Sequence, residues 1–272
     1  MILLVASKKD PAALNIAERL LVNHGFDETS ESSYGSPVYL KELGTGETAK
    51  LVFVEQEPVD TQSLTLPSPT RLLIFLSRHS SKSGTPTLSV HTPGNLGEAA
   101  SGGLPRKVSV ASASVMKEAL KAMRKAREEM DLSYEVSYEC THHGPSLDVP
   151  TMFTELGSSP KDWKDHQAAE AVARGAIAAA SSDKIYPAVL GIGGPHYNMQ
   201  FTKRALTTEI AFGHIIPKYS ISMMDAEMLR QCIAKTVEPV EKAVLDWKGI
   251  QGADRQRLLS LLCEIDIETE KL

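Results

Sequence analysis

Leu72-Leu73-Ile74-Phe75-Leu76 is an uninterrupted apolar run, and it decides the fold class. Runs of this kind are typical of parallel strands that are buried on both faces. A second apolar run, residues 1–6, is followed by Asp10-Pro11, a helix start with an acceptor at the N-cap and proline at N1. The expected helix ends at Gly25.

Outward from these runs, strands continue to alternate with helices. The patterns predict further strands over 38–43, 51–55, 87–91, 134–138, 188–192 and 210–216, and further helices over 114–130, 159–180, 225–236 and 254–265. Such alternation indicates an α/β fold with a mainly parallel, mixed sheet sandwiched by helices. No repeat or long linker divides the chain, so we expect one domain over 1–272, with no function assigned to the tail 240–272.

Composition excludes several classes of protein. The hydrophobic fraction of 42% and charged fraction of 23% exclude disordered, collagen-like and coiled-coil chains. Three distant cysteines without a CxxC pair exclude a thiolate-rich zinc finger and make a disulfide framework unexpected. No apolar run approaches twenty residues, so we expect a cytoplasmic protein that does not enter the membrane. A net charge of −5 argues against a general nucleic-acid coat protein.

Seven of the eight histidines lie between His79 and His214, and several follow expected strands. Arg78-His79 follows the strand at 72–76. The segment from Glu139 to Pro145, which contains His142-His143, follows the strand at 134–138. Ligands of open α/β sheets bind outside the carboxyl ends of the strands. We therefore expect these histidines to contribute to a functional site, although a loop histidine alone would as readily cap backbone groups.

A glycine-rich turn, Gly191-Ile192-Gly193-Gly194-Pro195-His196-Tyr197, follows the strand at 188–192. It is not a dinucleotide fingerprint, because His196 stands where the last glycine is required. Glycines permit positive φ and close approach of the backbone. We interpret the turn as a loop that presents His196 and Tyr197, with a purely structural turn as the alternative.

Imidazole and carboxylate ligands in one place suit a zinc ion. The candidate metal ligands are His79, His142, His143, His196 and Glu155. Glu139 is a further carboxylate that could complete the site. For an isolated His-His pair, one core and one exposed histidine would be the usual arrangement.

The segment from Arg106 to Arg127 is basic in an otherwise acidic chain, with seven Lys or Arg residues against one Glu, a sum of +6. Its candidate nucleic-acid ligands lie on one side of the expected helix: Lys117, Lys121, Arg124 and Lys125. A solvated helix face is the alternative to a phosphate-contacting strip.

Together these motifs resemble the archaeal and plant type of D-aminoacyl-tRNA deacylase. The resemblance rests on Ser77-Arg78-His79-Ser80-Ser81, Thr141-His142-His143-Gly144-Pro145-Ser146, Glu155-Leu156-Gly157-Ser158-Ser159 and Gly191-x-Gly193-Gly194-x-His196-Tyr197, in this order. It covers about 1–234.

The resemblance implies a zinc-dependent hydrolase that cleaves the ester between a D-amino acid, such as D-tyrosine, and tRNA, and so acts in chiral proofreading. It also implies a phosphorylase/hydrolase-like fold akin to peptidyl-tRNA hydrolase. The expected catalytic residues are Arg78, His79, Glu139, His142, His143, Glu155 and His196, and the expected substrate loop consists of Gly191, Gly193, Gly194 and Tyr197. The partner is D-aminoacyl-tRNA, no obligate protein partner is evident, and we expect a monomer.

Two routes to hydrolysis stay open. In one, zinc activates a water for attack on the ester carbonyl, and the metal or Arg78 stabilises the oxyanion. In the other, the 2′-hydroxyl of the substrate ribose is the activating group. Two other enzyme classes also stay open: another zinc hydrolase of the amidohydrolase or carboxypeptidase kind, and a nucleoside-phosphorylase-like enzyme. A non-catalytic tRNA-binding module would not need a buried histidine cluster.

Overall fold

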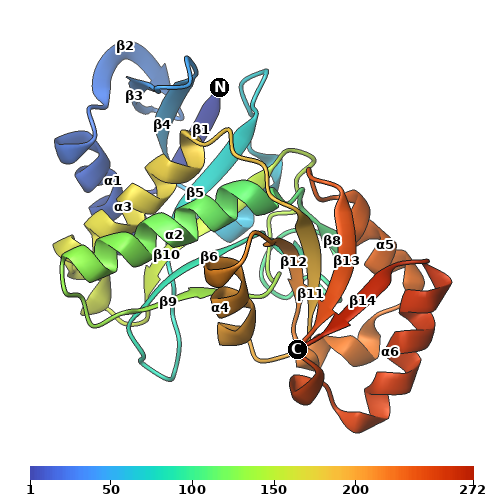
Figure 1. Cartoon of the computed structure of the whole chain (residues 1–272). Helices are drawn as coiled ribbons and strands as arrows, with labels where there is room; N and C mark the ends of the chain where they lie inside the picture. Colours follow the sequence, from blue (N-terminus) through green and yellow to red (C-terminus); the bar gives the residue numbers. More distant parts are fainter.

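An eight-stranded mixed sheet forms the larger part of the molecule (Figure 1). The computed structural model describes residues 1–272. The strand order is β2-β3-β4-β1-β5-β10-β6-β9. These strands are β1 (Ile2–Ser7), β2 (Asp27–Ser33), β3 (Ser36–Glu42), β4 (Thr48–Val54), β5 (Leu72–Arg78), β6 (Thr87–His91), β9 (Glu135–Tyr138) and β10 (Thr151–Gly157). The central strands β4, β1, β5 and β10 are parallel, whereas β6 runs antiparallel to β10.

A second sheet has four parallel strands in the order β12-β11-β13-β14. They are β11 (Ala188–Ile192), β12 (Ala211–Ile216), β13 (Val240–Leu245) and β14 (Glu268–Lys271). A two-stranded ribbon, β7 (Gly94–Asn95) with β8 (Lys107–Val108), lies at the two ends of a glycine-rich loop. The expected α/β fold with a mixed, largely parallel sheet is therefore confirmed.

Helices α1 (Pro11–Asn23), α2 (Ala113–Glu129) and α3 (His166–Ala180) cover one face of the large sheet (Figure 1). The remaining helices, α4 (Met199–Thr207), α5 (Ala226–Ala234) and α6 (Gly252–Glu264), accompany the second sheet. Short 3₁₀ turns are η1 (Pro58–Ser63), η2 (Asp162–Lys164), η3 (Lys218–Met223) and η4 (Trp247–Gly249). No helix is long and apolar enough to span a membrane.

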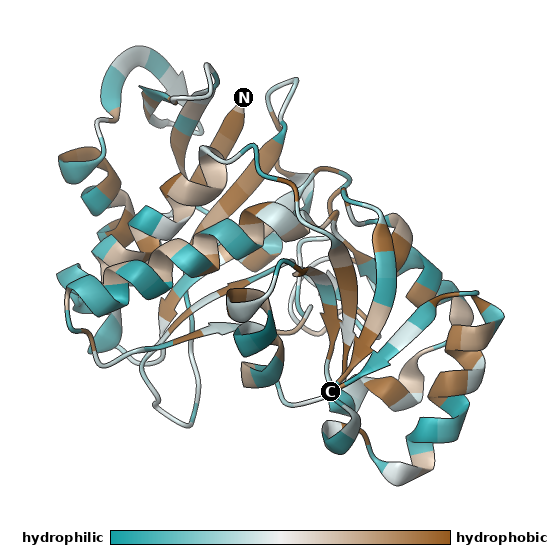
Figure 2. Ribbon diagram, in the orientation of Figure 1, coloured by the Kyte–Doolittle hydropathy of each residue, from teal (hydrophilic) through white to brown (hydrophobic).

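Strands β1 and β5 are hydrophobic along most of their length (Figure 2), and their side chains alternate between two cores. Leu72, Ile74 and Leu76 pack under the helices, in a cluster of 45 buried residues that also contains Phe212 and Val244 of the second sheet. Leu73 and Phe75 point to the other face, where the loop residues Leu64, Leu66 and Leu147 pack in the same cluster. The apolar run therefore predicts correctly a strand that is buried on both sides.

Two helix starts differ from expectation. The α3 helix begins at His166 rather than after Ser159, because the Asp165 carboxylate accepts hydrogen bonds from the amides of Gln167 and Ala168 at 2.9 and 3.1 Å. Residues 162–164 form only the turn η2. The α2 helix begins at Ala113, and its first amides are capped by Glu238 from a distant segment. The sequence interpretation also missed β2, β7, β8, β10, β13, β14 and α4.

Candidate active site

The side chains expected to form a site come together where the two sheets meet. His79 directly follows β5, Glu139 follows β9, Glu155 lies in β10, and His196 follows β11. The loop after β9 links the sheets, since Cys140 N donates to His196 O at 2.9 Å. Thr141 N likewise donates to Ile215 O of β12 at 2.8 Å. Strand ends distant in sequence therefore place their histidines in one region.

Two buried carboxyl groups surround His79. Its Nδ1 lies 3.2 Å from Glu139 Oε1 and 3.3 Å from Glu155 Oε2. Ser89 donates to Glu139, and Tyr197 is hydrogen-bonded to His79 Nε2. Antiparallel pairing of β10 with β6 places Glu155 opposite Ser89, which brings this hydroxyl to the carboxyl pair.

The three ionisable groups His79, Glu139 and Glu155 differ in their protonation. Burial opposes protonation of His79, but hydrogen bonds to Glu139 and Glu155 raise its pKa to about 10. Burial would raise the pKa of Glu139, yet His196 and His79 hold it well below its usual range. Burial and the charge of Glu139 raise the pKa of Glu155 to about 8. At neutral pH, Glu139 is thus ionised, Glu155 is protonated and His79 is a cation.

A second group contains only imidazoles. The ring of His91, the last residue of β6, lies 4.3 Å from that of His142 and 4.9 Å from that of His143, centroid to centroid. Both ring nitrogens of His91 are buried without a hydrogen-bond partner. Burial lowers the pKa of all three rings. They are therefore neutral, which is the form that binds metal ions.

A third group connects the loop after β9 to η3. His196 Nδ1 lies 3.2 Å from Cys140 Sγ and 3.1 Å from the hydroxyl of Tyr219. Its Nε2 donates to Glu139 Oε2 at 2.8 Å. Burial lowers the pKa of His196, but contacts with Cys140 and Glu139 raise it to about 10. His196 is therefore a second cation held by the same carboxylate.

The three groups are also the ones whose ligand atoms could hold a metal ion: His91 with His142 and His143, Cys140 with His142 and His196, and His79 with Glu139 and Glu155. The five ligands expected from the sequence are thus divided between groups rather than gathered in one. His91, Cys140 and Tyr219 belong to the site although the expected residue set omitted them. The position of His91 at a strand end was a usable signal, whereas nothing near Tyr219 pointed to the site.

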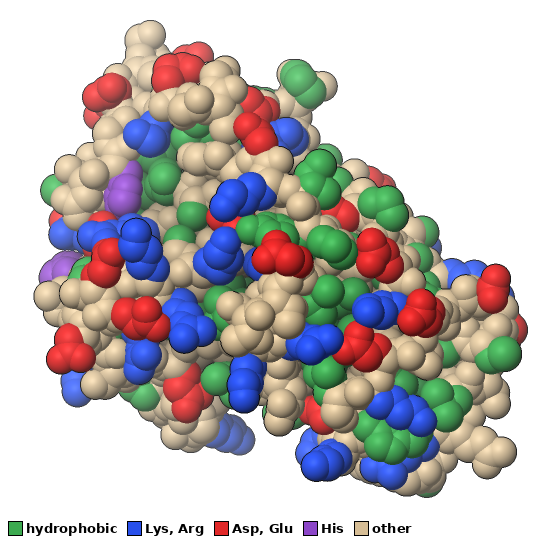
Figure 3. All heavy atoms as spheres, viewed as in Figure 1, with side chains coloured by type: hydrophobic (Ala, Val, Ile, Leu, Met, Phe, Trp, Pro, Cys, Tyr) green, Lys and Arg blue, Asp and Glu red, His purple; other side chains and the backbone are tan.

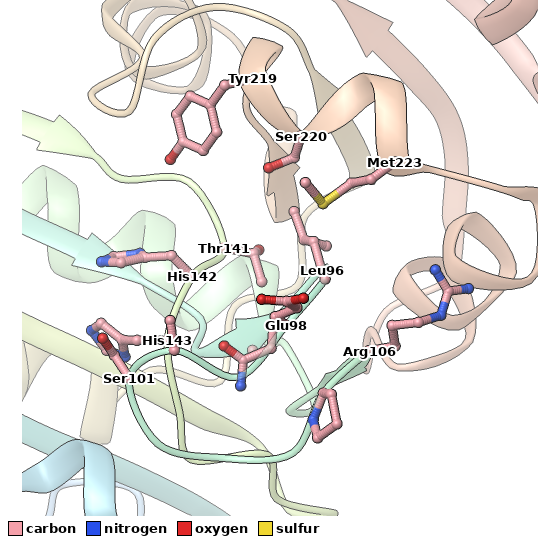
Figure 4. Close-up of a pocket in the computed structure, with 15 residues that line it drawn as sticks. Leu96, Glu98, Ser101, Arg106, Thr141, His142, His143, Tyr219, Ser220 and Met223 are labelled. Carbon is pink, nitrogen blue, oxygen red and sulfur yellow. The ribbon is translucent and has the colours of Figure 1, made fainter.

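Two cavities meet at His142 and His143. The larger, of about 750 Å³, lies between the loop Gly94–Arg106 and η3, with His142 and His143 at one end (Figure 4). The smaller, of about 310 Å³, is lined by Glu57, Arg78, His79 and Glu155, among others. The histidine pair therefore forms a wall common to both cavities.

Arg78 faces the smaller cavity with its charge already paired. Its guanidinium contacts both carboxylate oxygens of Glu57 at 3.2 Å and donates to Lys9 O at 3.2 Å. Its backbone N–H donates to Asp10 Oδ2 at 2.7 Å. These contacts fix the strand end from which His79 projects.

The glycine turn after β11 holds His196 in place and lines neither cavity. Gly193 and Gly194 have φ of +109° and +74°, and a Cβ on Gly194 would lie 2.6 Å from Asp246 Oδ2. Asp246 N also donates to Ile192 O at 2.9 Å. Asp246 directly follows β13, so the tail 240–272 supports the turn that carries His196 and Tyr197.

The basic side chains of α2 do not form a continuous strip. Lys117 is 2% exposed and donates to the carbonyls of Thr208 and Ile210 at 2.6 and 3.0 Å, so it cannot contact a phosphate without leaving the core. This corrects the expectation for Lys117. The others pair with acids of the same helix: Lys121 with Glu118, Arg124 with Glu128 and Lys125 with Glu129. Figure 3 shows basic and acidic side chains interspersed over this face.

Comparison with known proteins places the chain in a family. The family model described as D-aminoacyl-tRNA deacylase matches residues 67–270. The D-aminoacyl-tRNA deacylase of Pyrococcus abyssi is 38% identical over 272 residues, which cover 98% of both chains. The chain belongs to the D-aminoacyl-tRNA deacylase family. The deacylase of Thermococcus kodakarensis is likewise 38% identical, with 98% of both chains covered.

Among solved structures, a conserved protein of unknown function shares the fold of this deacylase-family chain, with a TM-score of 0.88 and 30% identity over 100% of this chain and 95% of the other. The match to the deacylase family continues to residue 270, whereas the resemblance drawn from motifs ended near residue 234. The tail therefore belongs to the family's common structure, which agrees with the place of β13 and β14 in the second sheet.

Proposed function

We propose that this chain hydrolyses the ester bond between a D-amino acid and the terminal ribose of tRNA. Membership of the deacylase family supports this reaction over the peptide-cleaving and phosphorylase alternatives. The observation that carries the proposal is the junction of two cavities at His142 and His143. There, a carboxyl group with a pKa of about 8 lies close to neutral imidazoles and to two cationic ones.

Glu155 is the proposed general base. It lines the smaller cavity, and its raised pKa makes the ionised form a stronger base than an ordinary carboxylate. It accepts a proton from the attacking water and returns it to the ribose oxygen that leaves. His79 lies 3.3 Å away and holds the carboxyl group in position through its Nδ1.

His79 and His196 are the proposed electrostatic stabilisers. Both are protonated at neutral pH, and Glu139 fixes both through hydrogen bonds. His79 lines the smaller cavity and the ring of His196 lies 4.4 Å from that of His142, which places both positive charges near the region in which negative charge would develop on the ester carbonyl oxygen. Arg78 and the turn Gly191, Gly193, Gly194 and Tyr197 act by holding His79 and His196 in place, and not by direct contact with the reacting atoms.

Zinc is the proposed metal, held by His91, His142 and His143. Three neutral imidazoles form a donor set that suits zinc, and one of the two unpartnered nitrogens of His91 would gain a partner there. When bound, zinc would supply a Lewis acid that polarises the ester carbonyl. Cytoplasmic location and a monomeric state stay predictions.

Hydrolysis of D-tyrosyl-tRNA compared with L-tyrosyl-tRNA tests the proposal. We expect release of tyrosine from the D-form and little from the L-form. Equal rates would contradict proofreading even if ester hydrolysis were present. Activity that persists in chelated, metal-free protein would favour activation by the ribose 2′-hydroxyl over a role for zinc.

A further inference from the structure

The two cavities that share His142 and His143 differ in the chemistry of their walls. The larger combines a glycine-rich backbone with the large side chains of Leu96, Tyr219 and Met223, and Glu98 and Arg106 also line it. The smaller is lined mostly by ionisable side chains. The 3′ end of an aminoacyl-tRNA likewise has two different parts, one on each side of its ester bond. One is the terminal nucleoside with its aromatic base, and the other is a small amino acid with an α-ammonium group.

We propose that the larger cavity binds the terminal nucleoside of the tRNA, with its base against Tyr219 and Met223, and that the smaller cavity receives the D-amino acid. This assignment rests on the proposed function and specifies which side of the histidine wall each part occupies. It adds Tyr219 and Met223 of η3 to the substrate-binding residues.

Exposure of two large side chains at the larger cavity supports the nucleoside assignment. Tyr219 is 53% exposed and Met223 is 48% exposed, although both line a concave site (Figure 4). Every nucleobase has a π-face that stacks on such a side chain. Met223 also packs against the loop on the other side of the cavity: a Cβ placed on Gly97 would lie only 2.7 Å from the Met223 sulfur.

Charge around the larger cavity is mixed, because both Arg106 and Glu98 line it. Arg106 lines the cavity and is balanced by Asp225 at 2.7 Å. Lys107 and Lys218 are exposed and directly adjoin the lining residues Arg106 and Tyr219 in sequence. Neither lysine lines the cavity itself, so the nucleoside assignment rests on the side chains of Tyr219 and Met223 and not on phosphate contacts.

The smaller cavity suits an amino acid better than a base. It offers no aromatic face apart from imidazoles, and its volume is less than half that of the larger cavity. Asp10 is occupied by the amides of Ala12 and Ala13 and by Arg78 N. Glu57 stays partly exposed beside Arg78, and its carboxylate is the acceptor we assign to the α-ammonium group.

Tyr219 joins nucleoside binding to the catalytic groups. Its ring faces the larger cavity, while its hydroxyl lies 3.1 Å from His196 Nδ1 and 3.2 Å from Cys140 Sγ. A base stacked on this ring would restrain the tyrosine that contacts His196. The nucleoside and the proposed oxyanion stabiliser are therefore linked by a single side chain.

The test uses two small probes, 5′-AMP for the nucleoside and D-tyrosinamide for the amino acid, with calorimetry on the full chain. Met223→Trp fills the larger cavity, and we expect it to weaken AMP binding by about tenfold or more while D-tyrosinamide binding changes less than about twofold. Val59→Trp fills the smaller cavity, and we expect the reverse. Met223→Glu, which repels the phosphate, should also weaken AMP binding.

Met199→Trp is the matched control, because Met199 is also 48% exposed and lines a separate hollow beside α2. AMP that fails to bind the parent protein, or binds Met223→Trp and Met199→Trp equally, overturns the assignment; so does loss of only D-tyrosinamide binding in Met223→Trp. Hydrolysis of D-tyrosyl-tRNA by the parent protein is measured separately. A protein that loses AMP binding as expected but never hydrolyses the substrate retains the nucleoside site and refutes only the proposed function.

Discussion

Glutamine substitution at Glu139 and at Glu155 makes the same chemical change on two sides of His79, yet the structure predicts a large loss of stability for the first and little change for the second. Glu139 is an ionised carboxylate that holds two cations, the buried His79 and the partly exposed His196. Glu155 is protonated at neutral pH, so glutamine replaces a neutral group by another of the same size. Only the first substitution leaves buried charge without compensation.

The magnitude follows from His79, whose side chain is only 9% exposed. Burial lowers its pKa, but hydrogen bonds to Glu139 and Glu155 raise it from 6.5 to about 10. That difference corresponds to about 5 kcal/mol, an upper bound because Glu155 supplies part of it. Breaking a buried ion pair typically costs about 3–5 kcal/mol. We expect Glu139→Gln to lower the free energy of unfolding by about 3 kcal/mol or more at pH 6, and Glu155→Gln by less than about 1 kcal/mol.

Urea denaturation at several pH values, with chelator present, measures both effects. A histidine with a raised pKa stabilises the fold fully below pH 6.5, and this stabilisation disappears as pH rises towards 10. The lowered pKa of Glu139 stabilises the fold above about pH 4.5. The loss in Glu139→Gln should therefore be greatest between about pH 4.5 and 6.5 and small near pH 10. The raised pKa of Glu155 destabilises the fold as pH rises from 4.5 to 8, so Glu155→Gln should match the parent or exceed it near pH 8.

Equal losses in the two variants at pH 6 would refute this division of charge. So would a loss in Glu139→Gln that stays constant from pH 6 to pH 10, because a steric cause would not follow the titration of histidine. NMR titration of the histidine rings provides an independent check. The pKa of His79, about 10 in the parent protein, should be lower in Glu139→Gln.

Three further predictions concern activity and binding. As general base, Glu155 should make kcat/KM rise with pH through about 8, and Glu155→Gln should lower kcat by about 10²–10⁴-fold; an unchanged pH profile in that variant would exclude it as the base. His91→Ala should bind less zinc by elemental analysis than the parent, and full zinc content would remove His91 from the proposed ligands. Reversal of Lys121 and Arg124 to Glu should weaken tRNA binding and reduce its salt dependence by a slope of at most about 2; an unchanged slope would make this helix face a solvated surface.

The sequence predicts strand ends well where apolar runs stop at polar residues. His79 and Glu139 are found this way, because the buried strands β5 and β9 end one or two residues before them. The sequence does not reveal β10, since Thr154 and Glu155 interrupt its apolar pattern. Glu155, the buried carboxyl group that interrupts this pattern, is also the group whose pKa is raised to about 8 in the site.

Division of the site into groups could not be read from the sequence. Whether His142 lies nearer to His91 or to His79 depends on the pairing of β6 with β10 and on the positive φ of His143, 41°. Lys117 shows that the sequence can also assign a residue to a surface wrongly. Its spacing on α2 matches that of Lys121 and Arg124, but its ammonium group donates to carbonyls 91 and 93 residues away. Contacts between residues so far apart in sequence do not alter the hydrophobic periodicity from which helices and strands are predicted.

One carboxylate accounts for the two kinds of histidine in the site. Glu139 approaches His196 to 2.8 Å and His79 to 3.2 Å, which makes both cationic, but it lies 3.7 Å from His142. Burial outweighs the weaker attraction of Glu139 for His142, and an added cation there would also face the other imidazoles in a medium of low dielectric constant. The cations His79 and His196 therefore help to keep His142 and His143 neutral, as their lowered pKa values reflect. A single buried anion thus accounts for the two cations, whereas burial keeps the imidazoles of His142 and His143 neutral although Glu139 acts to raise their pKa.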